Sequence, residues 1–168
     1  MSGESSKSIT PSLPGLLGGK SKVLREDNRV DPRIVRALEP FGLDGVQPTS
    51  TIDHSSSLDE QLLFSSETES FFHQIDESVT NNVVPIDGIE RSTEVIQGPD
   101  GNDIKLYIHK PMGLSGPMPC IFHTHGGGMV ILQASMGVYS HWRDRLSAEG
   151  VVVVGVEFRN GAGALGDH

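Results

Sequence analysis

The chain has 168 residues, a length that allows a domain with a buried core. Its 13 basic residues are scattered among 22 acidic ones, so no basic patch for nucleic acid is expected. One cysteine, Cys120, excludes an internal disulfide and a disulfide-rich secreted scaffold. No apolar run has the length of a membrane span, and residues 1–10 lack the apolar core of a secretory signal. We therefore expect a cytoplasmic protein.

The N-terminal half carries helix signals. Residues 1–22 are rich in Ser, Gly, Pro and Leu, which predicts a flexible arm. Asp31 and Pro32 suit the N-cap and the first position of a helix, and Gly42 suits its end. Apolar residues recur between them at helical spacing: Ile34, Leu38 and Phe41.

Two capping-box patterns follow, at residues 57–60 and 66–69, and they predict two successive helices. The second helix carries Phe71 and Phe72 on an apolar side. These phenylalanines fit two interpretations, simple core packing or a lid over an apolar pocket.

The pattern changes after Pro85 to a β-β-β-α-β order. Strands are predicted at residues 89–96, 104–110, 119–124 and 151–158, and a helix at residues 137–149. A turn at residues 98–101 joins the first two strands. The helix repeats apolar residues every four positions, at Val138, Trp142 and Leu146. A crossover helix between apolar strands predicts an α/β fold with a mostly parallel sheet.

The chemistry-bearing segment runs from His123 to Met129 and includes three consecutive glycines. Glycines permit backbone angles closed to other residues and a close approach to the main chain, so their N–H groups can face a developing oxyanion. A tight connection is an alternative, whereas the phosphate-loop signatures are absent. His123 and His125 could also be two metal ligands, but a third is not obvious, with only His109 and His141 near.

The run His125-Gly126-Gly127-Gly128 resembles the HGGG motif of the hormone-sensitive-lipase family of α/β hydrolases. Residues 31–38 and 158–160 also resemble that family. The resemblance implies the N-terminal part of an α/β-hydrolase fold. It divides the chain into the flexible arm at 1–22, a helical cap region at 23–80 and an incomplete first half of the core at 81–168.

The resemblance also implies site roles. The backbone N–H groups of Gly127 and Gly128 would be oxyanion donors, Gly126 would form the turn, and His125 would support the loop through its ring. Substrate, a small-molecule ester, would be bound by three apolar side chains: Met129, Phe71 and Phe72. No cofactor and no metal are implied.

The sequence departs from the family in its nucleophile. No G-x-S-x-G elbow is present, and the nearest match, at Ser115, has Pro117 in place of the second glycine and precedes a strand. The elbow and triad are therefore expected beyond His168. One interpretation is a carboxylic-ester hydrolase. This chain would hold its oxyanion-hole half and would be inactive alone. The alternative is a truncated, inert hydrolase-like protein or binding module. Self-association through an unpaired edge at residues 119–124 is also expected.

Overall fold

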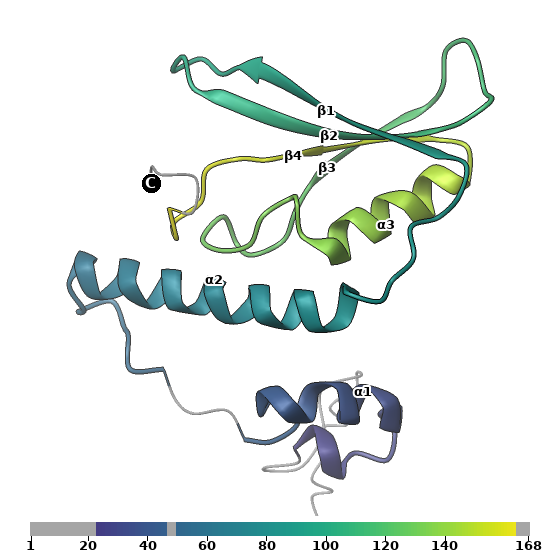
Figure 1. Ribbon diagram of the computed structural model, residues 1–168. Helices are drawn as coiled ribbons and strands as arrows, with labels where there is room; N and C mark the ends of the chain where they lie inside the picture. Colours follow the sequence, from purple (N-terminus) through teal and green to yellow (C-terminus); the bar gives the residue numbers. More distant parts are fainter. Residues whose placement is uncertain (1–22, 47–49, 164–168) are drawn as a thin grey trace, which may run out of the picture. The chain divides into compact units, whose positions relative to one another are not determined.

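The structure is a computed structural model that describes residues 23–46 and 50–163 (Figure 1). The chain divides into two compact units, Met1–Ser50 and Thr51–His168. The boundary falls inside the predicted helical region 23–80, and the predicted arm at 1–22 lies outside the described residues. No helix in the described ranges is both long and apolar enough to cross a membrane.

The first unit contains α1 (Pro32–Leu38), flanked by the short 3-10 helices η1 (Leu24–Glu26) and η2 (Glu39–Phe41). Asp31 caps α1 by accepting the Arg33 N–H at 2.8 Å, and Pro32 occupies the first turn. Gly42 ends the segment in the left-handed conformation, with φ of 68°. The predicted start and end of this helical segment are confirmed, and its last turn is 3-10.

The second unit begins with a single long helix, α2 (Leu58–Thr80). The capping box at its start is confirmed, because Ser57 and Glu60 bond reciprocally to each other's backbone N–H. The second predicted capping box, at residues 66–69, is wrong because the helix runs through it. Ser70 there donates its hydroxyl to the Ser66 carbonyl, as mid-helix serines can, and no Gly or Pro interrupts α2.

The predicted strands and the later helix are confirmed to within two residues. They are β1 (Ile89–Gln97), β2 (Asp103–Pro111), β3 (Cys120–Thr124), α3 (Gly137–Ala148) and β4 (Val152–Val156). The four strands form one sheet in the order β1-β2-β4-β3. The unit is therefore of the predicted α/β class.

The sheet is mixed over the described residues, which corrects the expectation of a mostly parallel sheet. β3 and β4 pair in parallel across the α3 crossover, whereas β1–β2 and β2–β4 pair antiparallel. The tight turn at residues 98–101, with Gly101 at φ of 75°, forces β2 back along β1. The parallel part lies where β3 leads into the glycine segment.

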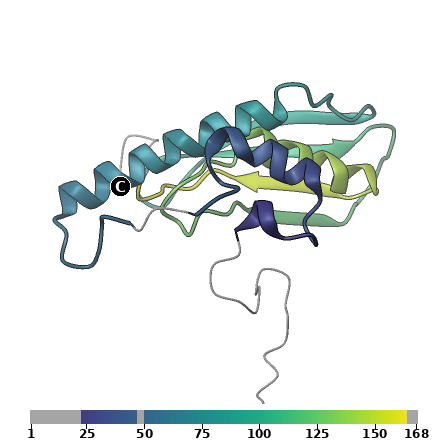
Figure 2. The same ribbon diagram turned by 90° about the horizontal axis from the view of Figure 1, so that it is seen from below.

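Two helical layers lie on one side of the sheet. α3 contacts β1, β2 and β4, and α2 packs against α3 (Figure 1). Seen from below, α2 runs lengthwise under this assembly (Figure 2). The helices are joined by the buried Asp76 carboxylate of α2, which accepts the N–H groups of Gly137 and Val138 at 2.8 and 2.9 Å. Asp76 thereby caps α3, whose own N-cap residue, Met136, makes no side-chain cap.

The buried face of α3 is polar, contrary to the sequence pattern. Val138 and Trp142 are 40% and 43% exposed, so the predicted apolar stripe is not the side that packs on the sheet. The buried residues of α3 are Arg143, Asp144 and Ser147. Asp144 is accommodated by Arg91 of β1 and His109 of β2, and Arg143 donates to the Ala134 carbonyl at 2.9 Å.

Candidate active site

The glycine loop, residues 125–129, leaves the C-terminal end of β3. Gly127, Gly128 and Met129 have left-handed φ values of 105°, 65° and 62°, whereas Gly126 does not. The Gly127 carbonyl accepts the N–H groups of Val130 and Ile131 at 3.1 and 3.2 Å. The hydrogen-bonded turn therefore starts at Gly127, and the role expected for Gly126 stays a prediction.

Gly127 has no room for a side chain. A Cβ at this position would lie 2.0 Å from the Ile131 carbonyl oxygen, which is backbone and cannot rotate away. A Cβ at Gly128 would meet no atom within 4 Å, but its φ still favours glycine. The two positions need glycine for different reasons, close approach at one and backbone angle at the other.

The three glycine N–H groups differ in their partners. The Gly126 N–H donates to the Tyr139 hydroxyl at 3.1 Å. Within residues 23–46 and 50–163, the N–H groups of Gly127 and Gly128 donate to no protein acceptor. Two successive backbone donors are thus available to a ligand atom.

The loop is tied to the segment that follows β4. The N–H groups of Gly161 and Ala162 donate to the carbonyls of Met129 and Val130 at 3.1 and 2.7 Å. Buried Asn160 donates its amide to the Leu132 carbonyl at 2.7 Å and to Glu69 of α2 at 3.4 Å. These contacts hold the exit of the glycine loop to β4 and to α2.

His125 is buried beneath the loop. Its Nδ1 lies 2.8 Å from the Gly126 carbonyl oxygen, and its ring stacks on Phe158 at 4.1 Å between centroids. Its Nε2 lies 3.7 Å from Glu157, whose buried carboxylate accepts the N–H groups of Ala134 and Ser135. The ring thus contacts the loop, the end of β4 and the start of the α3 segment.

The three apolar candidates for substrate binding lie in two places. Met129 is 74% exposed at the end of the glycine loop. Phe71 and Phe72 lie half-buried on α2, with their rings edge to face at 5.9 Å between centroids. Substrate contact by these side chains stays a prediction.

The structure also locates Ser115, the nearest match to an elbow serine, and His123, a possible metal ligand. Ser115 is exposed in the loop between β2 and β3, away from any strand-to-helix turn. The His123 ring packs 4.6 Å from that of Trp142, and burial lowers the pKa of His123. In the described part of the chain, no three His, Cys, Asp or Glu side chains are grouped to hold a metal ion.

Sequence reasoning missed a polar cluster under α3, which we call the Asp144 cluster: the buried residues Asp144 and His109 and the partly exposed Arg91. Arg91 donates to both carboxylate oxygens of Asp144, at 2.9 and 2.7 Å. His109 Nδ1 lies 2.7 Å from Asp144 Oδ1, and a carboxylate only accepts, so this nitrogen carries the proton. The signal that could have found the cluster is that Arg91 of β1 and His109 of β2 lie directly opposite each other in the antiparallel pair, so both side chains face the same side of the sheet.

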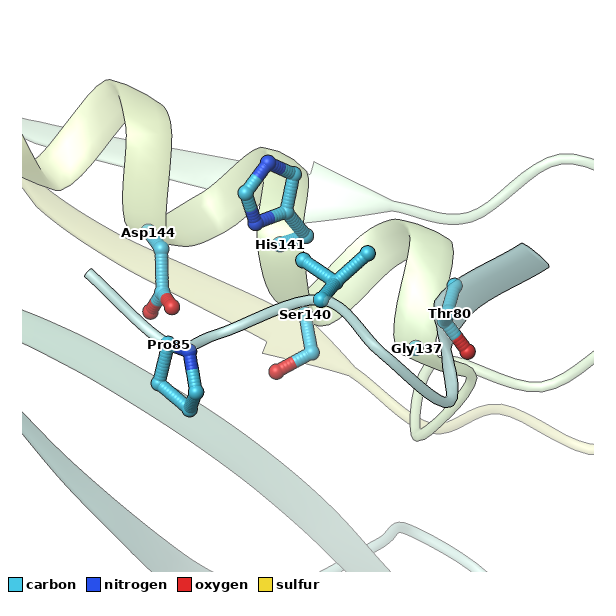
Figure 3. Close-up of a pocket in the computed structure, with 7 residues that line it drawn as sticks. Thr80, Pro85, Gly137, Ser140, His141 and Asp144 are labelled. Carbon is cyan, nitrogen blue, oxygen red and sulfur yellow. The ribbon is translucent and has the colours of Figure 1, made fainter. Parts of the chain in front are cut away.

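A pocket of about 140 Å³ adjoins this cluster (Figure 3). It is lined by Ser140, His141 and Asp144 of α3 and by the chain from Thr80 to Pro85. None of the glycines of residues 126–128 lines it. It is therefore separate from the candidate oxyanion site.

We expect His109 of the Asp144 cluster to make stability pH-dependent. Burial lowers the pKa of His109 and outweighs the opposing effect of the hydrogen bond that His109 donates to Asp144. The unfolded chain then binds more protons below the unfolded value of about 6.5, so the stabilisation is complete above that pH and is lost as pH falls. We expect the free energy of unfolding to fall between pH 7 and 5, by at most about 1.4 kcal/mol per pH unit for this group. Urea titrations at each pH, followed by Trp142 fluorescence, measure it.

The matched variants are His109→Gln and His54→Gln. The slope of unfolding free energy against pH should decrease in His109→Gln, and His54→Gln, at an exposed position, should retain the parent slope. An unchanged slope in His109→Gln would assign the pH dependence to other groups.

Known proteins of similar sequence and structure are esterases. No family model matches the sequence. Brefeldin A esterase, a bacterial homologue of human hormone-sensitive lipase, superposes with a TM-score of 0.78 and 38% identity, over 93% of this chain and 44% of its own. Esterase Est22 with p-nitrophenol superposes with a TM-score of 0.64 and 27% identity, over 82% of this chain and 40% of its own. Gut esterase 1 of Caenorhabditis briggsae is 34% identical over 58 residues, 34% of this chain and 10% of its own.

The second unit thus has the architecture of the first part of an α/β-hydrolase fold. The resemblance to the hormone-sensitive-lipase family is confirmed by the match to its bacterial homologue. The chain spans less than half the length of the proteins that it matches.

Proposed function

We propose that this chain supplies the oxyanion hole of a serine carboxylic-ester hydrolase. The observation that carries the proposal is the pair of successive N–H groups, at Gly127 and Gly128, that lack acceptors among the described residues. They lie on a loop fixed at Gly126 by Tyr139 and beyond Met129 by the segment after β4. Preorganised donors of this kind stabilise the negative oxygen of a tetrahedral intermediate.

In the complete enzyme, a serine would attack the ester carbonyl with a histidine as base and an acidic residue orienting that histidine. The carbonyl oxygen would become an oxyanion held by the Gly127 and Gly128 N–H groups. His125 would support the loop and not act as the base, because its ring is stacked on Phe158 and buried. Met129 would border the ester site, and Phe71 and Phe72 are candidates for its apolar wall.

A second candidate is an inert hydrolase-like protein, or a module that binds a partner. The motif G-x-S-x-G does not occur within these 168 residues, so the two candidates predict different continuations of the chain. Sequencing the transcript past the His168 codon separates the two. Continuation into a G-x-S-x-G elbow supports the hydrolase, and an immediate stop codon supports the second candidate.

The 168-residue chain alone should show no saturable hydrolysis of a p-nitrophenyl ester. The sequence offers no elbow serine, and oxyanion donors without a triad leave on the order of 10³-fold over water only where a formed pocket persists. Release of p-nitrophenol against a buffer blank measures this, with Ser115→Ala as the companion. Saturable turnover that survives Ser115→Ala would require another nucleophile. Turnover lost in that variant would make Ser115 catalytic.

We also propose that the 168-residue chain self-associates through β3. Within the described residues β3 pairs only with β4, and Phe122 on it is 64% exposed. An unpaired apolar edge is a template for another strand, and salt weakens the repulsion due to a net charge of −9. Sedimentation should therefore show oligomers that grow with salt.

The matched variants place one lysine on each edge strand. Phe122→Lys on β3 should reduce association, and Val95→Lys on β1, at a 53% exposed position, should not. A monodisperse parent chain at moderate salt would contradict the proposal, and dissociation by Val95→Lys alone would assign the contact to β1.

A further inference from the structure

Tyr139 connects α3 to the glycine loop. It lies in the first turn of α3, and its hydroxyl accepts the Gly126 N–H at 3.1 Å. Its ring lies 5.6 Å from that of His123 and 5.9 Å from that of His125, measured between centroids. Tyr139 therefore contacts the strand end, the loop histidine and the first glycine together.

The hydroxyl is a close neighbour of Gly126. A Cβ built at Gly126 would lie 2.9 Å from it, closer than side chains normally approach. Burial raises the pKa of the Tyr139 phenol, so the hydroxyl remains neutral at physiological pH. A neutral hydroxyl oxygen is a stable acceptor for one backbone N–H.

Helix α2 holds the start of α3, and therefore the position of Tyr139. Buried Asp76 accepts the N–H groups of Gly137 and Val138, the two residues that precede Tyr139. The Tyr139 N–H in turn donates to the Met136 carbonyl at 3.1 Å. The phenol thus projects from a helix end that a second helix holds in place.

We infer that Tyr139 is a positioning residue for the oxyanion loop, which it orders by occupying the Gly126 N–H. With this first N–H bound, the turn begins at Gly127, and the next two N–H groups are the ones left for a ligand oxygen. The inference rests on the proposed function for its catalytic consequence. The ordering of the loop stands independently of it.

The first experiment uses the 168-residue chain and two variants, Tyr139→Phe and Ser140→Ala. Residue-resolved hydrogen exchange should be about fivefold faster at Gly126 in Tyr139→Phe, the factor for loss of a typical neutral hydrogen bond. Exchange in β4 should be unchanged. Ser140 lines the separate pocket of Figure 3, so Ser140→Ala should match the parent at Gly126. Equal acceleration in the loop and in β4 would show a global loss of stability and overturn the inference.

A double-mutant cycle provides a second readout. Gly126→Ala should lower the denaturation midpoint of the parent chain, because its methyl group meets the hydroxyl. The same change in the Tyr139→Phe background should have less than half that effect, since the obstructing oxygen is gone. Additive effects would mean that the two residues do not contact each other in solution.

The catalytic consequence is tested in the complete enzyme. Tyr139→Phe should lower kcat about tenfold with little change in KM, since a displaced oxyanion donor acts on the transition state. A change in KM alone would overturn the positioning role. No ester hydrolysis by the parent enzyme would refute the proposed function, while the exchange result would still decide whether Tyr139 orders the loop.

Discussion

In the complete enzyme, Gly127→Pro should lower kcat for a p-nitrophenyl ester by about 10² to 10³, the usual effect of losing one oxyanion donor. Proline has no N–H to donate, and its fixed φ near −65° is incompatible with the φ of 105° at Gly127. The ground-state ester makes little use of this donor, so KM should change less than kcat. Steady-state kinetics measure both constants, and circular dichroism shows whether the variant is folded.

Two companion variants separate loss of the donor from strain in the backbone. Gly113→Pro makes the same change at another left-handed glycine, φ of 75°, in the loop before β3, and should retain kcat. Gly128→Pro removes the second donor where a Cβ meets no atom within 4 Å, but proline cannot adopt the φ of 65° there, so its expected loss of kcat counts only if circular dichroism shows a folded variant. A folded Gly127→Pro or Gly128→Pro enzyme with near-normal kcat would remove that N–H from the mechanism.

The glycine loop and the strands around it were predictable because their signals are local. Three successive glycines after an apolar strand already restrict the backbone, and the structure places left-handed angles at Gly127 and Gly128. The role of Tyr139 was not predictable in this way. Its contact with Gly126 spans 13 positions and depends on how Tyr139 and Trp142 of α3 lie against His123 of β3.

The helices show why an apolar pattern can mislead. Val138 and Trp142 repeat at helical spacing, yet Asp144 is buried against the sheet, because β1 and β2 present Arg91 and His109 there. Burial of a charge is tolerated when a partner neutralises it, and that partner lies more than 30 positions away in sequence. Pattern analysis of one helix cannot contain this information.

The same reasoning applies to α2. Its second capping-box pattern lies inside the continuous helix, and Glu69, the acid of that pattern, is buried and accepts a hydrogen bond from Asn160. Asp76, seven residues later on the same helix face, caps α3. These two acidic residues of α2 are contacts to other parts of the unit, Glu69 to the segment after β4 and Asp76 to α3.

The Asp144 cluster carries the largest expected effect on stability. Asp144→Asn keeps the size of the side chain but removes the charge that neutralises Arg91, and it turns one acceptor oxygen into a donor amide facing His109 or Arg91. Breaking a buried ion pair by changing one partner costs about 3 to 5 kcal/mol. We expect the lower end, about 3 kcal/mol, because the Arg91 side chain is 34% exposed and can be partly hydrated.

Urea unfolding at pH 7, followed by the fluorescence of Trp142, the only tryptophan, measures this loss. Glu149→Gln makes the same chemical change at the exposed end of α3 and should alter stability by less than about 0.5 kcal/mol.

The pKa of Asp144 lies below its ordinary value, since the hydrogen bonds from Arg91 and His109 outweigh the effect of burial. The carboxylate is therefore ionised in the folded state, and its stabilisation is present above about pH 4 and lost only at lower pH. The difference between parent and Asp144→Asn should accordingly shrink as pH falls below 4. A pH-independent difference, or a loss of under 1 kcal/mol at pH 7, would mean that water rather than Arg91 and His109 satisfies the carboxylate.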